Sequence, residues 1–178
     1  AKDKNKLLES DLREMNAELV SFSELIEEGW LTIKKGHEVG SDSYGTGEIP
    51  FVRTSDISNF EISIDPTKSV SKEIYDKYSK DQNLKTGDIL MVVDGRYRIG
   101  RTAILHNHNS KCIVQSHLKI ISLNKDKSKM DPYKLLYLLS MQSVQRDIRS
   151  LIFIQSTLGS IGGRIREIKI PIPKKINK

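Results

Sequence analysis

Hydrophobic residues near the start of the chain recur at alternating spacings of four and three positions, with acidic residues elsewhere. They are Leu8, Leu12, Met15, Leu19, Phe22 and Ile26. A stripe of this period predicts an amphipathic helix. Because three heptads are short for an independent coiled coil, the stripe favours packing on the protein's own body or on a neighbouring helix. Ser21 and Glu24 have the spacing of a capping box, which predicts that a second helix begins near Phe22, and Gly29 ends the pattern.

From Trp30 onward the period changes, and short apolar runs between polar turns predict strands. The candidate strands cover residues 30–35, 49–53, 60–64, 87–93, 99–105, 112–123 and 166–173. The run 87–93 is continuously apolar, which predicts a strand that is covered on both faces. Prolines in the last run suit the edge of a sheet. Residues 36–48 are rich in Gly, Ser and Asp and are predicted to be irregular.

Two further helices are predicted in this part of the chain. Residues 71–78 form a short candidate, and Asp131 and Pro132 suit the N-cap and first turn of a longer one. The stripe of the longer helix is Tyr137, Met141, Val144, Ile148 and Leu151. Residues 155–165 are polar and dotted with glycine, which predicts a loop or a broken short helix. Many short strands with a few helices predict a mixed α+β domain.

The charge distribution divides the chain into two parts. The net charge is +6, but residues 1–28 hold four basic and eight acidic side chains, so the remainder carries all of the positive excess. A basic body favours a polyanionic partner, usually nucleic acid, although a solubilising lysine surface is the alternative. We therefore divide the chain into an N-terminal connecting helix, residues 1–20, and a body, residues 21–178.

Motifs of catalysis and cofactor binding are absent from the sequence. There is no GxxxxGK(S/T), HExxH or GxSxG, and the single cysteine, Cys112, excludes a disulfide framework. His106 and His108 lack a third ligand nearby, so no metal site is predicted. Glu167 and Lys169 have the spacing of half a nuclease metal site, but an amphipathic strand accounts for them better. We expect no enzyme activity and no cofactor in this chain, and, without a membrane-length apolar run or a signal peptide, a cytoplasmic protein.

Four polar or basic clusters lie at the ends of predicted strands. They are Lys34 and Lys35; Arg53, Thr54, Ser55 and Asp56; Arg96, Tyr97, Arg98 and Arg101; and Gln155, Ser156, Thr157 and Arg164. Arginine can donate two bonds to guanine, glutamine can pair with adenine, and aspartate can accept from cytosine. Lysines and hydroxyls suit phosphates. The four clusters together therefore predict a DNA-binding surface. For any one cluster a solvated surface is the alternative, and at Asp94 and Gly95 that alternative is a tight hairpin turn.

Within this surface each residue type suggests a role. The candidates for base edges are Arg53, Arg96, Arg98, Arg101 and Gln155, and the candidates for phosphates are Lys34, Lys35, Ser55, Thr157 and Arg164. Tyr97 is expected to stack or to pack against sugar.

In their order and spacing, several stretches of the chain resemble a known family. They are GEIPFVRTSDISNFEISID, GDILMVVDGRYRIGRTAIL, QSHLKI and the C-terminal series DPYKLLYLL, VQRDIRS and GGRIREIKIPIPK. Over residues 22–175 the chain is similar to the target recognition domains of type I restriction–modification specificity subunits and of related adenine-N6 DNA methyltransferases. The resemblance implies an α/β domain with a curved, partly barrel-like sheet, which presents loops to the major groove of double-stranded DNA.

The same resemblance implies partners. In that family, recognition domains alternate with long helices that dock on methyltransferase subunits, and residues 1–20 are similar to such a helix. Leu8, Leu12, Met15 and Leu19 are therefore candidates for partner binding. S-adenosylmethionine is expected in the catalytic partner or in a fused catalytic domain, and a restriction nuclease subunit or a second copy of the helix is a further candidate partner. The chain is either half of a two-fold assembly or the C-terminal part of a single-chain methyltransferase.

The predicted function is sequence-specific recognition of double-stranded DNA, which positions an adenine-N6 methyltransferase on its target. Two other classes stay open. A small nuclease or methyltransferase domain would turn over DNA with Mg²⁺ or S-adenosylmethionine. A protein–protein interaction module with an incidentally basic surface would show no DNA affinity even at low salt, and would bind through the apolar stripe of residues 8–26.

Overall fold

The computed structural model describes residues 2–58, 60–155 and 158–174 of the chain. Its helices are α1 (Lys2–Glu14), α2 (Phe22–Glu27), α3 (Lys72–Gln82), α4 (Lys125–Ser128), α5 (Pro132–Ser140) and α6 (Gln142–Ser150). Its strands are β1 (Ala17–Ser21), β2 (Leu31–Lys35), β3 (Phe51–Val52), β4 (Ile57–Ser58), β5 (Glu61–Ile62), β6 (Ile89–Val92), β7 (Asp94–Gly95), β8 (Thr102–Ile104), β9 (Ile113–Val114), β10 (Leu118–Leu123), β11 (Phe153–Gln155), β12 (Leu158–Ser160) and β13 (Lys169–Pro173). Short 3-10 turns lie between them: η1 (Ser41–Ser43), η2 (Thr54–Asp56), η3 (Pro66–Lys68), η4 (Asn107–Asn109) and η5 (Gly162–Glu167).

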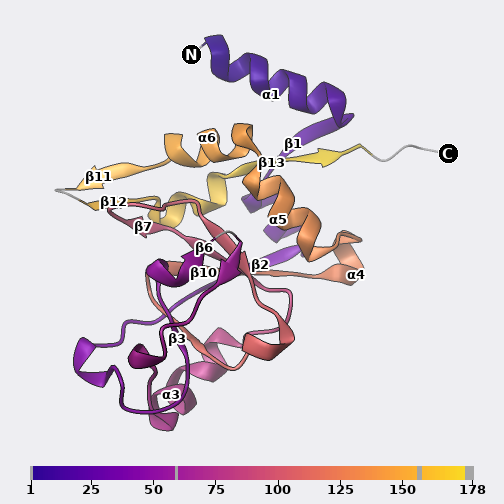
Figure 1. Cartoon of the computed structure of the whole chain (residues 1–178). Helices are drawn as coiled ribbons and strands as arrows, with labels where there is room; N and C mark the ends of the chain where they lie inside the picture. Colours follow the sequence, from indigo (N-terminus) through magenta and orange to yellow (C-terminus); the bar gives the residue numbers. More distant parts are fainter. Residues whose placement is uncertain (1, 59, 156–157, 175–178) are drawn as a thin grey trace.

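An antiparallel sheet in the order β2-β10-β6-β8 lies at the centre of the body (Figure 1). Side chains of β6 alternate between two hydrophobic clusters: Ile89 and Met91 lie in one, and Leu90 and Val92 lie in the other. Every residue of β6 is buried. The prediction of a strand covered on both faces is therefore confirmed, because each face of the sheet has its own core.

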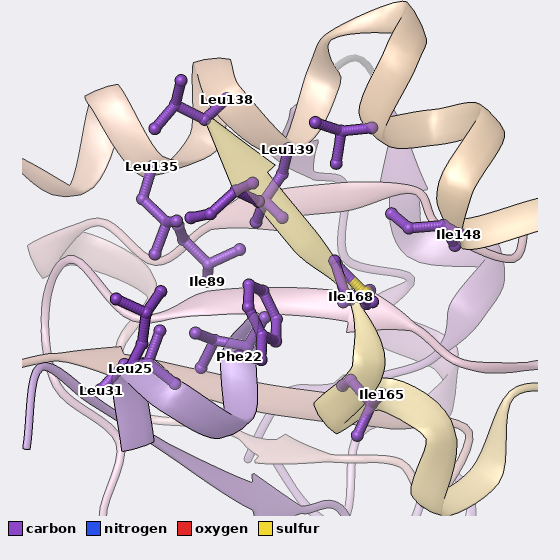
Figure 2. Packing of buried hydrophobic residues seen from close by; sticks show 14 of the residues in the cluster. Phe22, Leu25, Leu31, Ile89, Leu135, Leu138, Leu139, Ile148, Ile165 and Ile168 are labelled. Atoms are coloured by element: carbon purple, nitrogen blue, oxygen red, sulfur yellow. The ribbon is translucent and has the colours of Figure 1, made fainter. Parts of the chain in front are cut away.

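The larger core lies between the sheet and the helices (Figure 2). Figure 2 shows side chains of α2, α5, α6 and the C-terminal segment converging on the sheet; the labelled ones are Phe22, Leu25, Leu31, Ile89, Leu135, Leu138, Leu139, Ile148, Ile165 and Ile168. Each fully buried side chain of this size contributes about 1.5–3 kcal/mol. This core fixes the position of the C-terminal segment, which contributes to the candidate site below.

The opposite face of the sheet is covered mostly by loops and by the parallel pair β3–β9 (Figure 1). Helix α3 is attached to β9 through Gln82, which is completely buried. The Gln82 side chain donates to the carbonyl of Val114 and accepts from its amide, both at 2.9 Å. The buried side chain thus makes, with both main-chain groups of one strand residue, the two bonds that a neighbouring strand would make.

The predicted helix over residues 1–20 is wrong beyond residue 14. Helix α1 ends at Glu14, and Asn16 adopts a left-handed φ of +46°. Residues Ala17–Ser21 form β1, which pairs in antiparallel fashion with β13. The apolar spacing continues through Leu19, but hydrogen bonds to a strand some 150 positions later determine the conformation there. The capping box of Ser21 and Glu24 at the start of α2 is confirmed.

The long helix predicted after Asp131 is two helices. Asp131 caps α5 and Pro132 lies in its first turn, as predicted. At Met141, however, ψ is +140°, which ends α5 and begins α6. The Gln145 side chain donates to the carbonyl of Leu139 at 2.7 Å and to that of Gly100 at 3.0 Å. The break therefore leaves a helix-end carbonyl satisfied and connects the two helices to the loop before β8.

Two other predicted segments also differ in detail. The predicted strand 112–123 is two strands, β9 and β10, interrupted at residues 115–117. The segment 155–165, predicted as a loop or broken helix, contributes to a hairpin, β11–β12, which is followed by η5. The described strands form separate small sheets and no closed barrel. Within the described ranges, no helix is long and apolar enough to cross a membrane.

Candidate nucleic-acid interface

One end of the central sheet gathers several of the predicted clusters. In the strand register, Lys119 lies opposite both Lys35 and Met91, and Leu118 lies opposite Val92. The end of β2, the end of β6 and the beginning of β10 therefore lie together. The loop 94–101, which leaves from the end of β6, therefore extends from the same end of the sheet as Lys34 and Lys35.

The C-terminal hairpin joins this end through β7. Gly159 and Ser160 of β12 pair with Gly95 and Asp94, and the hairpin projects from the body (Figure 1). A Cβ at Gly159 would stand 3.1 Å from the side chains of Ile99 and Ile152, so glycine lets these side chains pack closely against the hairpin backbone. Gln155 is the last residue of β11, whereas Ser156 and Thr157 lie outside the described residues.

The cluster after β3 is connected to the same loop by Arg98. The Arg98 guanidinium donates to the carbonyl of Ile57 at 3.0 Å. Arg98 also has a left-handed φ of +74°, which turns the chain back toward β8. The bond to Ile57 therefore links the cluster after β3 to the loop 94–101, and the individual residues of the predicted clusters differ in what they can bind.

The loop 94–101 carries the most accessible cationic side chains of this surface. Arg96, Tyr97, Arg98 and Arg101 are exposed, Tyr97 at 75%. Its base is held by main-chain bonds from Gly100 to Val92 and from Val92 to Arg101. Among the described residues, no hydrogen bond or ion pair engages the side chains of Arg96 and Arg101. A firmly held loop base with uncommitted arginines suits recognition of base edges or phosphates.

Arg53 and Asp56, by contrast, bind each other. The Asp56 carboxylate accepts from the amide of Arg53 at 2.9 Å, and the guanidinium lies 3.8 Å from Asp56 and 3.5 Å from Asp65. Asp56 is buried. Burial raises the pKa of Asp56, and the amide and charge of Arg53 oppose that shift. Both side chains therefore hold the turn η2 together. Thr54 donates its amide to Gln115 at 3.4 Å, which leaves Ser55 as the exposed member of this cluster.

Lys34 and Lys35 point to opposite faces of β2 and differ in role. The ammonium of Lys34 donates to the main-chain carbonyls of Gln82 and, at 3.0 Å, Asn83. It therefore caps the C-terminal end of α3, where a cation is favoured. Burial lowers the pKa of Lys34, and the carboxylate of Asp88 opposes this shift. Lys35 is exposed and remains available to a ligand.

The Arg164 side chain also makes hydrogen bonds within the protein. Its Nε donates to Glu167 at 3.0 Å, and Nη1 donates to the carbonyl of Leu151 at 3.2 Å. These bonds connect η5 to the end of α6. Although the Arg164 side chain is 44% exposed, both bonds hold η5 in place.

A basic pocket at the same end of the sheet was not predicted. It has a volume of about 290 Å³, and its lining residues are Ile33, Lys34, Lys35, Lys119, Gly162, Gly163, Ile165 and Arg166. Lys119 is half-buried within β10, whose other residues are apolar except for Ser122. In the sequence, a single lysine within this strand was the feature that could have indicated the pocket. His117 bonds Asp94 next to this pocket, which agrees with the prediction of a hydrogen-bonded structural histidine.

The candidate partner surface is partly covered by the chain itself. Leu8, Leu12, Met15 and Leu19 are all half-buried. Helix α1 contacts β1 and α6, and Met15 packs against the larger core. Leu19 lies on β1, so the four residues do not form one helical stripe. Over the described ranges, no group of three or more His, Cys, Asp or Glu side chains could hold a metal ion.

Comparison with known proteins gives a consistent result. The family model described as "Type I restriction modification DNA specificity domain" matches residues 21–178. Among solved structures, the chain is similar to the S subunit of a type I restriction–modification system from M. genitalium (TM-score 0.57, 15% identity, 89% of this chain and 34% of that chain). It is also similar to the HsdS subunit from Thermoanaerobacter tengcongensis (TM-score 0.56, 17% identity, 97% of this chain and 39% of that chain).

A third similar structure concerns complex assembly and conformational transition of the type I restriction–modification system (TM-score 0.57, 18% identity, 97% of this chain and 40% of that chain). At such identities the likeness establishes the fold. The chain spans between 34% and 40% of the length of these structures. No curated protein matches the chain in sequence.

Proposed function

The chain belongs to the family of type I restriction–modification DNA specificity domains, and on this basis we propose that it reads a base sequence in double-stranded DNA through the loops at one end of its central sheet. The family membership confirms the resemblance found in the sequence. The reading loops would be residues 94–101 and the hairpin β11–β12. Arg53, Asp56 and Lys34, assigned to DNA from the sequence, serve in this proposal to hold those loops and their supports.

The observation that carries the proposal is the loop 94–101. Its base is fixed by main-chain hydrogen bonds to β6, and its arginines Arg96 and Arg101 are exposed and uncommitted among the described residues. Arginine forms bidentate bonds with the O6 and N7 atoms of guanine in the major groove. The neighbouring hairpin is joined to this loop strand to strand, so the two would approach one groove as a unit.

Catalysis would lie in a separate subunit or domain. We propose that a methyltransferase that uses S-adenosylmethionine acts on adenine while this chain holds the flanking sequence, because an enzyme that modifies a base must take that base out of the stack. The N-terminal helix α1 and its apolar residues Leu8 and Leu12 would contribute to assembly with that partner. A nuclease subunit would join the same assembly. The protein would act in the cytoplasm.

The test is selection of bound sequences from a pool of random duplex DNA by the full chain, repeated across a salt series. We expect an enriched motif and an affinity that falls with salt, by about 0.9 log units per log unit of salt for each phosphate contact. Duplexes with the enriched motif and with the same bases in scrambled order then give the specificity ratio. Absence of binding at low salt would contradict the proposal, and salt-dependent binding without a motif would contradict sequence reading by the chain alone.

A further inference from the structure

Two lysines lie directly opposite each other at the end of the central sheet from which the loop 94–101 extends. Lys35 of β2 and Lys119 of β10 are partners in the antiparallel register. Directly opposed residues of an antiparallel pair project from the same face, with Cβ atoms about 4.5–5.5 Å apart. Like charges in this arrangement are destabilising. The repulsion between these two lysines therefore lowers the stability of the fold.

No acid of the described chain neutralises this pair directly. None of the ion pairs within 4.0 Å involves Lys35, Lys119 or Arg166. Burial lowers the pKa of Lys119; the carboxylate of Asp94 opposes this shift, and the charge of Lys35 adds to it. Asp94 is itself hydrogen-bonded to His117. An anion that entered this space would relieve the repulsion between the two ammonium groups.

The segment η5 provides the opposite wall. Gly162, Gly163 and Arg166 line the same pocket of about 290 Å³ as the two lysines. A side chain at Gly163 would meet no atom within 4 Å, so open space lies above its backbone. Ile165 is buried in the larger core and anchors η5, and Arg164 holds it to α6. The position of η5 is therefore fixed. Lys35, Lys119 and Arg166 line a pocket whose wall at Gly162 and Gly163 carries no side chain.

We propose that Lys35, Lys119 and Arg166 bind one phosphate of the DNA backbone in the pocket beside Gly162 and Gly163. This inference rests on the proposed function and adds to it a contact that orients the duplex. The pocket lies between the sheet end and η5, and η5 directly follows the hairpin β11–β12. A phosphate held there would place the adjoining groove against the hairpin and the loop 94–101. Because the site offers lysine ammonium groups and a recess of limited volume, it would hold backbone and not read bases.

The test uses the full chain with Lys119→Met and Arg166→Gln, and Lys125→Gln as a matched control. Lys125 is exposed on α4, which follows the opposite end of β10. For both pocket variants we expect about tenfold weaker binding to the enriched and scrambled duplexes alike, and a salt slope that is smaller by about 0.9. The control should keep the slope of the unmodified chain. Lys119→Met should also keep or raise the thermal midpoint, because it removes one of two opposed charges.

The outcomes separate this inference from the function on which it rests. If the unmodified chain binds no duplex at low salt, the proposed function fails, and the phosphate site with it. If the unmodified chain binds but both pocket variants keep its salt slope, the phosphate site is wrong and the function stands. A selective loss of affinity for the enriched duplex would likewise overturn the phosphate assignment, since it would mean that the pocket reads bases. Arg166 is exposed, so its variant keeps the test valid if Lys119→Met fails to fold.

Discussion

Two segments of this body carry arginines in similar sequence surroundings and use them differently. Residues 53–58 and 94–101 both follow a buried strand, and the bond from Arg98 to Ile57 joins them. In the first segment, Arg53 lies between the carboxylates of Asp56 and Asp65. In the second, Arg96 and Arg101 extend from the body. The same residue type supports the fold in one segment and faces solvent in the other.

The difference lies in the acids that surround each arginine. Asp65 lies twelve positions after Arg53 and reaches it because the chain returns through β4 and β5. The loop 94–101 contains one acid, Asp94, and that acid bonds His117. A surface that binds a polyanion needs cations whose charge is not already matched, because a matched cation must first be released. The availability of an arginine therefore matters more than its presence.

The largest effect that separates the two segments is expected for Arg53→Ala. This change leaves the buried Asp56 without its cation, which should lower the free energy of unfolding by about 2–3 kcal/mol. Urea denaturation of the variant measures it. Arg101→Ala is the matched control and should stay within about 0.5 kcal/mol of the unmodified chain. An Arg53→Ala protein of full stability with lost DNA affinity would reverse the assignment of this residue.

A second readout of the same change is the reactivity of Cys112. This thiol lies in the cluster that also contains Ile57, and burial raises its pKa to about 12. A thiol reagent should therefore modify Cys112 only after the body opens. Arg53→Ala should speed the modification, and Arg101→Ala should leave its rate unchanged.

The next largest effect is expected for Arg96→Ala and concerns DNA. If Arg96 reads a base, its loss should weaken binding to the enriched duplex by about 1–3 kcal/mol and relax the preference at one base pair. Selection from the random duplex pool with the variant measures both. Stability should not change, since no described contact of the side chain is removed. If affinity and sequence preference both stay as they were, the loop 94–101 is not the reading loop.

A smaller effect is expected for the pH dependence of Asp56→Asn. Burial raises the pKa of Asp56 above its ordinary value of 3.8, so the folded state holds this proton more tightly than the unfolded state. Stability is therefore lost as the pH rises from the ordinary pKa through the raised one. Relative to the unmodified chain, Asp56→Asn should gain stability between about pH 4 and pH 7, by less than about 1.4 kcal/mol for each unit of pKa shift. Denaturation at both pH values checks this sign, and a constant difference would contradict it.

The last prediction is a small net change in stability for Arg98→Gly. The variant loses the bond to Ile57, worth about 1 kcal/mol, but glycine adopts the left-handed φ of +74° at little cost. The two contributions should nearly cancel in the free energy of unfolding. Arg98→Ala keeps the strained backbone and loses the bond, so it should be less stable than Arg98→Gly. Equal stability of the two variants would mean that the backbone at this position carries no strain.

Much of the fold could be predicted because its signals are local. The N-cap at Asp131, the capping box at Ser21 and the two-faced strand at Ile89–Val92 each depend on a few neighbouring residues. The conformation of Leu19 could not be predicted in this way. Its spacing fits a helix, but its pairing partner is β13, some 150 positions later in the sequence.

The candidate site could be located from the sequence more readily than its contacts. The loops at strand ends stay the predicted region, and the structure adds that Arg96 and Arg101 are exposed there. The role of Lys34 depends on where α3 ends, and that of Arg53 depends on Asp65. Lys119 was missed because an isolated lysine in a strand gives no indication of which residue lies opposite. The roles of these three residues depend on contacts with residues far away in the sequence, and a single sequence does not show which residues those are.

The pairing of β1 with β13 has a consequence for how such a body can change over evolutionary time. Ala17 lies opposite Pro173 and Ser21 lies opposite Lys169, so the chain enters and leaves the body side by side. Everything between these strands can then be exchanged as a cassette, because another body with the same two-stranded stem would leave the flanking segments in register. A recombination event within the stem would transfer the whole body, with all of its loops, in one step. If the body reads DNA as proposed, a new sequence specificity would then arise by exchange of the whole body, and the hydrophobic core would stay intact.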